Sequence, residues 1–243
     1  MGAYNKKHKL VTTTKRAVRT LRYNTKEVHY DFHPESGVSE TVAESVSTYS
    51  ERIGIYAGAF DPVHAGHLKF ALEAQKQVKL DHVYFLAERS PGRGAEPEHY
   101  VHRTTMLTHA LRPYTQFSVF DLPDARLTLR SVTRINTEHA EVYVLTSASQ
   151  LLWNNGSLSP LYRSRNLVVA VTTDTQMAEV IERLSMGGRS LGNVMFVNIG
   201  TGHISSAVVR HGLRHRQLVR GLLPSVWRYA RKQWLYLPPI HRA

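Results

Sequence analysis

The chain has 243 residues, a formal net charge of +12 and no cysteine, and 42% of its residues are hydrophobic while 21% are charged. These fractions are ordinary for a soluble globular protein, and no apolar run approaches the roughly 18–20 residues that a membrane-spanning helix needs. The lack of cysteine excludes disulfides, thiolate metal sites and a cysteine nucleophile, and it fits a reducing compartment. We therefore expect a cytoplasmic protein without a membrane partner.

Residues 1–50 are predicted to form a basic and polar extension outside the fold, and residues 51–243 to form one domain. The segment HPESGVSETVAESVSTYSE is rich in Ser and Thr, which is typical of a linker. Residues 1–26 carry eight Lys or Arg and no acidic residue, and residues 183–243 carry ten Lys or Arg and again no acidic residue. Such basic ends are either solvated faces or surfaces for a phosphate-rich partner.

Short apolar runs alternate with helical patterns from residue 52 onward. Apolar runs predict buried strands, and apolar residues that recur every three or four positions predict helices. The predicted strands are 52–58, 82–87, 117–122, 141–147, 166–172 and 193–199. The predicted helices are 66–77, 101–111, 128–136, 175–185, 205–213 and 224–234.

Strands that alternate with crossover helices predict an α/β fold. We expect a Rossmann-like doubly wound parallel sheet with helices on both faces, followed by C-terminal helices. In such sheets ligands bind beyond the carboxyl ends of the strands. The decapeptide GAFDPVHAGH, residues 58–67, comes at the end of the first predicted strand, so it lies where a ligand site is expected.

Two histidines stand three residues apart in this decapeptide. Pro62 suits the approach to a helix, so His64 and His67 are expected on one face of its first turn. Unpaired N–H groups and the helix dipole would favour a phosphate there, and two imidazoles could donate hydrogen bonds to it. The alternatives are a surface pair without function and a zinc site. Zinc is disfavoured because the HExxH spacing is absent and Asp61 is the only nearby carboxylate.

The decapeptide closely resembles the signature of the HxGH nucleotidylyltransferases, especially nicotinate-mononucleotide adenylyltransferases, whose pattern is G-x-F-D-P-x-H-x-G-H. Seven fixed positions match: Gly58, Phe60, Asp61, Pro62, His64, Gly66 and His67. The later segment ISSAVVR is similar to the I-S-S-x-x-x-R motif of the same family and supplies Ile204, Ser205, Ser206 and Arg210. Seen alone, this segment is an ordinary helix N-cap followed by an arginine.

The resemblance implies an adenylyltransferase of NAD biosynthesis that moves AMP from ATP to nicotinate or nicotinamide mononucleotide and releases pyrophosphate. It implies His64, His67 and Arg210 as catalytic residues, and Arg103 and Trp153, with Arg93 as a further candidate, as substrate contacts. It implies an ATP-binding set of Gly58, Ala59, Phe60, Asp61, Gly66, Ile204, Ser205 and Ser206. Mg²⁺ is expected to arrive with ATP, held mostly by phosphates and water rather than by a protein metal site. A homo-oligomer stays open.

The chain departs from the family pattern in two places. The family commonly has Gly-x-Asp after the strand that here reads EVYVLTS, and neither residue is present. Ala57 and Ala59 stand where the family has Gly and often Ser or Thr. Two alternatives therefore stay open: a sibling transferase that acts on a phosphopantetheine or cytidylyl acceptor, and a catalytically impaired nucleotide-binding protein whose basic ends bind nucleic acid.

Overall fold

The computed structural model describes residues 50–91, 97–121, 126–135, 140–153, 159–200 and 204–237. These residues belong to one compact unit, Ser47–Ala243. Residues 1–49 of the predicted extension lie outside the described residues, so the extension stays a prediction.

The strands form one six-stranded sheet in which every neighbouring pair is parallel. The spatial order is β3-β2-β1-β4-β5-β6, so the order reverses between β1 and β4 at the centre of the sheet. This reversal is the switch point beyond which ligands bind in doubly wound folds. The strands are β1 (Glu51–Gly58), β2 (His82–Ala87), β3 (Phe117–Val119), β4 (Ala140–Ser147), β5 (Asn166–Val171) and β6 (Val194–Asn198).

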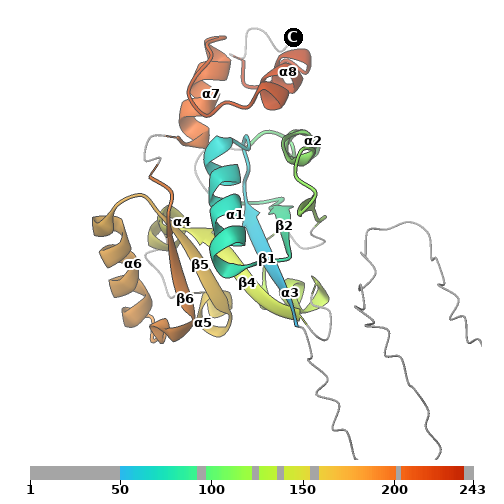
Figure 1. Ribbon diagram of the computed structural model, residues 1–243. Helices are drawn as coiled ribbons and strands as arrows, with labels where there is room; N and C mark the ends of the chain where they lie inside the picture. The colour runs from blue at the N-terminus through green and yellow to red at the C-terminus, as the bar shows by residue number, and fades with distance from the viewer. Residues whose placement is uncertain are drawn as a thin grey trace, which may run out of the picture. The chain divides into compact units, whose positions relative to one another are not determined.

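Helices cover both faces of the sheet (Figure 1). One core contains buried residues of α1 (Ala65–Val78), α2 (Tyr100–Leu111), α7 (Ser206–Arg214) and α8 (Pro224–Lys232). The other core contains buried residues of α3 (Leu129–Ile135), α4 (Ala148–Trp153), α5 (Pro160–Ser164) and α6 (Asp174–Met186), and a short 3₁₀ helix, η1 (Leu191–Asn193), precedes β6. The predicted Rossmann-like fold is thereby confirmed.

The ends of α1 and α7 meet above the sheet. Figure 1 shows α7 and α8 beyond the carboxyl end of β1, with the first turn of α1 next to α7. The backbone amide of Ala65, in that first turn, donates to the carbonyl of Gly221 over 2.9 Å. Gly221 has a φ of 88°, and a Cβ built there would lie 2.4 Å from Ile204 Cγ2, so only glycine fits this close approach.

Helices α4 and α5 were not predicted from the sequence, because they are too short to show a helical repeat. They have six and five residues, which is at most about two turns. α4 also follows β4 without an intervening loop. The predicted strand 117–122 ends early in the structure, at Val119.

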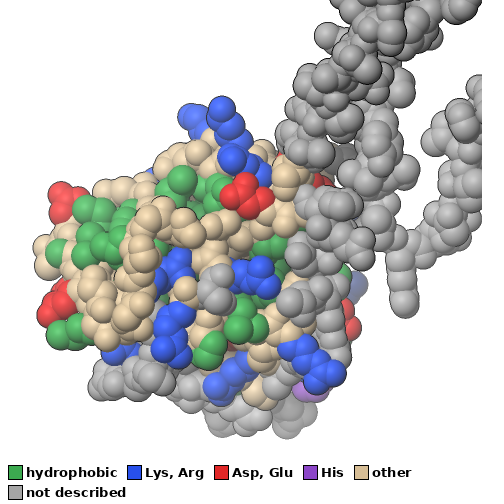
Figure 2. Space-filling view, turned by 90° about the horizontal axis from the view of Figure 1, so that it is seen from below, with side chains coloured by type: hydrophobic (Ala, Val, Ile, Leu, Met, Phe, Trp, Pro, Cys, Tyr) green, Lys and Arg blue, Asp and Glu red, His purple; other side chains and the backbone are tan. Residues whose placement is uncertain are grey.

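No helix in the described part of the chain is long and apolar enough to cross a lipid bilayer. Positive charge is not confined to the C-terminal helices. At the opposite end of the molecule, seen from below in Figure 2, Lys and Arg side chains lie spread among polar and apolar ones.

Candidate active site

His64 and His67 close the start of α1 with their side chains. His64 is the N-cap, and its Nδ1 accepts a hydrogen bond from the amide of Gly66 over 3.1 Å. His67 Nδ1 accepts from the amide of His64 over 3.2 Å, which completes a reciprocal capping box. The two rings stack with their centroids 3.7 Å apart. A Cβ at position 66 would lie 3.0 Å from the His64 ring, so Gly66 leaves room for this imidazole.

The capping box fixes the tautomer of both histidines. Because each Nδ1 accepts a backbone N–H, a neutral ring must carry its proton on Nε2. Burial lowers the pKa of His64 to about 4, and burial together with His64 lowers the pKa of His67 well below its ordinary value. Both rings are therefore neutral at pH 7, and each has one N–H to donate.

The free energy of unfolding is expected to fall as the pH drops from about 6.5 toward 4. The pKa of His64 is about 4 in the folded protein against an ordinary 6.5, so the unfolded chain binds the proton more readily. The stabilisation that comes from the neutral His64 ring is fully present above pH 6.5. As the pH falls toward 4, the unfolding free energy loses at most roughly 3 kcal/mol of it. His64→Asn keeps a capping oxygen and should flatten this dependence in urea unfolding measured across that range. Equal slopes in both proteins would contradict the assignment.

The expectation of unpaired amides at the start of α1 is wrong. The amide of Ala65 donates to Gly221, and the amides of Gly66 and His64 donate to the two imidazoles. These N–H groups cannot also bind a phosphate. Among the described residues 64–67, the Nε2–H groups of His64 and His67 remain as donors for an anion.

The start of α7 keeps the unpaired amides that α1 lacks. Ser205 is the N-cap, and its Oγ accepts from the amide of Val208 over 3.3 Å. The amides of Ser206 and Ala207 have no acceptor among the described residues. Of the two helices that carry the sequence motifs, α7 is therefore the one whose N-terminus is better suited to an anion.

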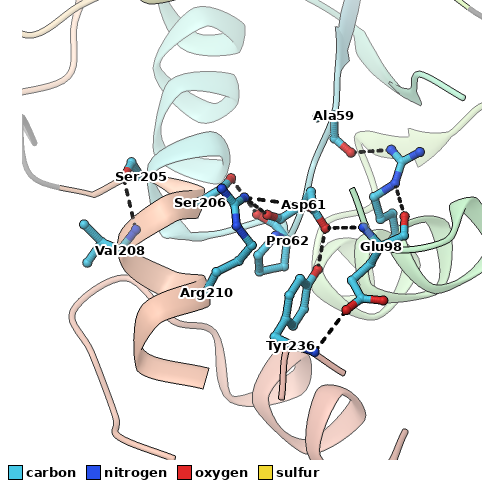
Figure 3. Close-up of polar contacts among 10 residues, drawn as sticks. Ala59, Asp61, Pro62, Glu98, Ser205, Ser206, Val208, Arg210 and Tyr236 are labelled. Carbon is cyan, nitrogen blue, oxygen red and sulfur yellow. Dashed lines mark hydrogen bonds and ion pairs between the residues drawn. The ribbon is translucent and has the colours of Figure 1, made fainter. Parts of the chain in front are cut away.

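Two side chains of α7 fasten this helix to the Asp61–Pro62 turn (Figure 3). Ser206 Oγ donates to the Pro62 carbonyl over 3.0 Å. Arg210 Nη1 donates to the Asp61 carbonyl over 2.5 Å and lies 3.5 Å from Asp61 Oδ2. Asp61 is buried, and its Oδ1 also accepts from the Glu98 amide over 3.2 Å and from the Tyr236 hydroxyl over 2.8 Å. This carboxylate thus joins four segments of the chain.

Both sequence motifs line one cleft of about 520 Å³ at the carboxyl ends of the strands. It lies at the switch point, because residues that follow β1, β4 and β5 all contribute. All eleven residues predicted for catalysis or ATP binding line it: Gly58, Ala59, Phe60, Asp61, His64, Gly66, His67, Ile204, Ser205, Ser206 and Arg210. The volume is within the range of about 300–1,000 Å³ typical of small-molecule sites.

A family model described as cytidylyltransferase-like matches residues 55–212, the span that contains both motifs and most of the sheet. The chain belongs to this family. It is a nucleotidyltransferase, similar to nicotinate-nucleotide adenylyltransferases.

Curated relatives agree with this family, and a solved structure agrees with the fold. The chain is 30% identical to a probable nicotinate-nucleotide adenylyltransferase of Carboxydothermus hydrogenoformans over 71% of this chain and 91% of that protein. It is 27% identical to one of Clostridium perfringens over 72% of this chain and 92% of that protein. The nicotinic acid mononucleotide adenylyltransferase of Plasmodium falciparum, complexed with APC, matches with a TM-score of 0.59 at 15% identity, covering 76% of this chain and 97% of the other.

Arg103 does not line the cleft, contrary to its expected role as a substrate contact. Its side chain is 1% exposed. Its Nε donates to the Glu98 carbonyl over 2.8 Å, Nη1 to that of Ala59 over 2.5 Å, and Nη2 to those of Glu88 and Arg89 over 2.8 and 3.4 Å. Arg103 therefore holds together the segments that border the cleft.

Trp153 is also placed away from the cleft. It ends α4, is 62% exposed, and is absent from the described lining residues. Arg93 lies outside the described residues. The structure thus brings the two motifs together in the cleft, but it does not bring the predicted substrate contacts Arg103 and Trp153 to them.

Four residues at this site were not predicted from the sequence: Glu88, Thr172, Gln176 and Tyr236. Gln176 lines the cleft, and its Oε1 accepts from both the amide and the hydroxyl of Thr172, over 2.9 and 3.1 Å. This pairing assigns the amide orientation and leaves the Nε2 hydrogens for a ligand. The sequence signal for Thr172 and Gln176 was the polar TTDTQ segment after β5, because it combines a helix cap with the carboxyl end of a strand.

Because the chain lacks the family's Gly-x-Asp, the part of the cleft lining that follows β4 carries no charge. Ser147, Ala148, Ser149 and Gln150 line the cleft there. The acidic residues among the described lining residues are Asp61 and Glu88, and each accepts a hydrogen bond from the protein. Among the described residues no group of three His, Asp or Glu side chains could hold a metal ion.

Proposed function

We propose that this chain transfers AMP from ATP to nicotinate mononucleotide and releases pyrophosphate, a step of NAD biosynthesis. The observation that carries the proposal is the convergence of the two motifs, 58–67 and 204–210, on one cleft. The family membership and the names of the curated relatives support the same reaction. We propose a cytoplasmic location for it, on the lack of cysteine.

In the proposed reaction a phosphate oxygen of the mononucleotide attacks the α-phosphorus of ATP in line, and the bond to the leaving pyrophosphate breaks. The attacking oxygen is already anionic, so no general base is needed. The enzyme must bring two anions together and stabilise the charge that develops on the leaving group.

We assign the Nε2–H groups of His64 and His67 to the α- and β-phosphates. Arg210, with the Ser205 hydroxyl and the free amides at the start of α7, would bind the β- and γ-phosphates. Neutral imidazoles suit this role because their pKa values keep the donor protons fixed across the neutral range. The acidic residues of the cleft, Asp61 and Glu88, already accept protein hydrogen bonds, which limits their repulsion of the anions.

Mg²⁺ is proposed to arrive with ATP. The donor set of the cleft fits an ion held by phosphates and water, because its carboxylates are few and engaged. When bound, the ion would neutralise part of the charge on the triphosphate.

The test is pyrophosphate release by the full-length protein with ATP, Mg²⁺ and a panel of acceptors. Nicotinate mononucleotide should give the highest kcat/KM, with nicotinamide mononucleotide as the matched comparison. The panel should also include phosphopantetheine with ATP, and choline phosphate with CTP. A higher kcat/KM with either of these would replace the proposal by a sibling activity, and no release with any acceptor would overturn it.

A further inference from the structure

Tyr236 lies on the turn that follows α8, 175 residues after Asp61 in the chain. Its side chain is 4% exposed, and its hydroxyl donates to Asp61 Oδ1 over 2.8 Å. Burial and the neighbouring Asp61 carboxylate raise the pKa of this phenol well above its ordinary value. The phenol therefore stays protonated and can act only as the donor in this contact.

The backbone around Tyr236 is held in a conformation that its sequence disfavours. Trp234 and Tyr236 have φ values of 55° and 62°, in the left-handed region that residues other than glycine adopt at a cost. The amide of Tyr236 donates to Glu98 Oε1 over 3.0 Å, and the amide of Glu98 donates to Asp61 Oδ1 over 3.2 Å. The three residues thus form a closed ring of hydrogen bonds, and the ring fixes the strained turn.

This ring divides the oxygens of Asp61 between two tasks (Figure 3). Oδ1 accepts from Tyr236 and Glu98, whereas Oδ2 and the backbone carbonyl face Arg210 Nη1, at 3.5 and 2.5 Å. Without the Tyr236 hydroxyl, only the longer bond from the Glu98 amide would hold Oδ1, so the carboxylate could rotate more readily and change the oxygen that it presents to the guanidinium. With the Tyr236 hydroxyl in place, Nη1 of Arg210 is fixed. Nε and Nη2 have no partner among the described residues and are left for a ligand.

We propose that Tyr236 is a positioning residue for Arg210 and acts through Asp61. The proposal rests on the proposed function, in which Arg210 binds the β- and γ-phosphates of ATP. The turn after α8 thereby supports a binding site that the segments 58–67 and 204–210 line. Its contribution is the preorganisation of one guanidinium, because a fixed donor loses no free energy to reorientation when charge develops.

The test compares Tyr236→Phe with wild type in the full-length protein. Losing one hydrogen bond to a buried carboxylate should lower kcat/KM and weaken ATP binding by about tenfold each. The matched control is Tyr143→Phe, because Tyr143 also donates to a carboxylate over 2.8 Å, that of Glu141, but at the other end of the sheet. The control should leave kcat/KM and the dissociation constant for ATP unchanged.

A double variant separates positioning from general loosening. In an Arg210→Ala background the Tyr236→Phe substitution should cause no further loss, because the group on which it acts is gone. The same tenfold loss in both backgrounds, or no loss in wild type, would overturn the inference.

Calorimetric titration with MgATP separates the inference from the proposed function. If no acceptor gives pyrophosphate, the proposed function fails, and the inference then stands or falls on whether Tyr236→Phe weakens ATP binding. A wild-type protein that binds no ATP would overturn both.

Discussion

His67→Ala is expected to lower kcat by at least 100-fold and to leave the fold intact. The Nε2–H of His67 is one of two fixed imidazole donors in the cleft. Removing one preorganised donor to a developing oxyanion typically costs about 10²–10³ in rate. The loss should appear in kcat more than in KM, because the donor is assigned to charge that grows in the transition state.

The structure supplies controls for this variant. Alanine also removes the acceptor for the amide of His64, whereas glutamine at the third helical position can restore a capping box. His67→Gln should therefore recover thermal stability without recovering kcat. His102→Ala removes another half-buried imidazole, which is hydrogen-bonded to Tyr229 over 3.0 Å, and should keep wild-type turnover. Near-normal kcat in His67→Ala, measured by pyrophosphate release, would remove His67 from the catalytic residues.

The sequence predicted the fold because its signals are local and repeated. β5 is buried along nearly its whole length, which is how a strand covered on both faces reads in sequence. α1 carries its buried residues at helical spacing. Once the strands were known to be parallel, their carboxyl ends had to lie on one edge of the sheet, and the ligand cleft lies there.

The sequence could not say which polar groups of the motifs are already used. Whether the amide of Ala65 is unpaired depends on Gly221, which lies 156 positions later and contacts it only in the folded chain. The same holds for Asp61, whose partners come from residues 98, 210 and 236. A pattern of residue types predicts that an anion site exists, but the donors left for the ligand emerge only from tertiary contacts.

Arginine is the residue for which this limit matters most. Arg103 and Arg210 both lie on helices beside the cleft, and both could have been assigned to phosphate. One is fully buried among carbonyl groups, whereas the side chain of the other is 36% exposed and shares the cleft with the histidines. Hydrophobic periodicity on α2 does not reveal this difference, because a guanidinium can be buried when backbone oxygens surround it.

Arg103→Lys is expected to lower the free energy of unfolding by about 2–6 kcal/mol. The guanidinium donates to four carbonyl groups, those of Glu98, Ala59, Glu88 and Arg89. An ammonium has one nitrogen and cannot span these positions, so at least two buried carbonyls lose their donor, at about 1–3 kcal/mol each.

Arg112→Lys, at the exposed end of the same helix, is the matched control and should leave stability unchanged. Urea unfolding measures the loss. A variant with the wild-type unfolding midpoint but a raised KM for the mononucleotide would instead return Arg103 to the substrate contacts. If stability falls as expected, the loops that border the cleft depend on one buried cation. The Arg103 guanidinium, rather than the ligand, then determines the geometry of these loops.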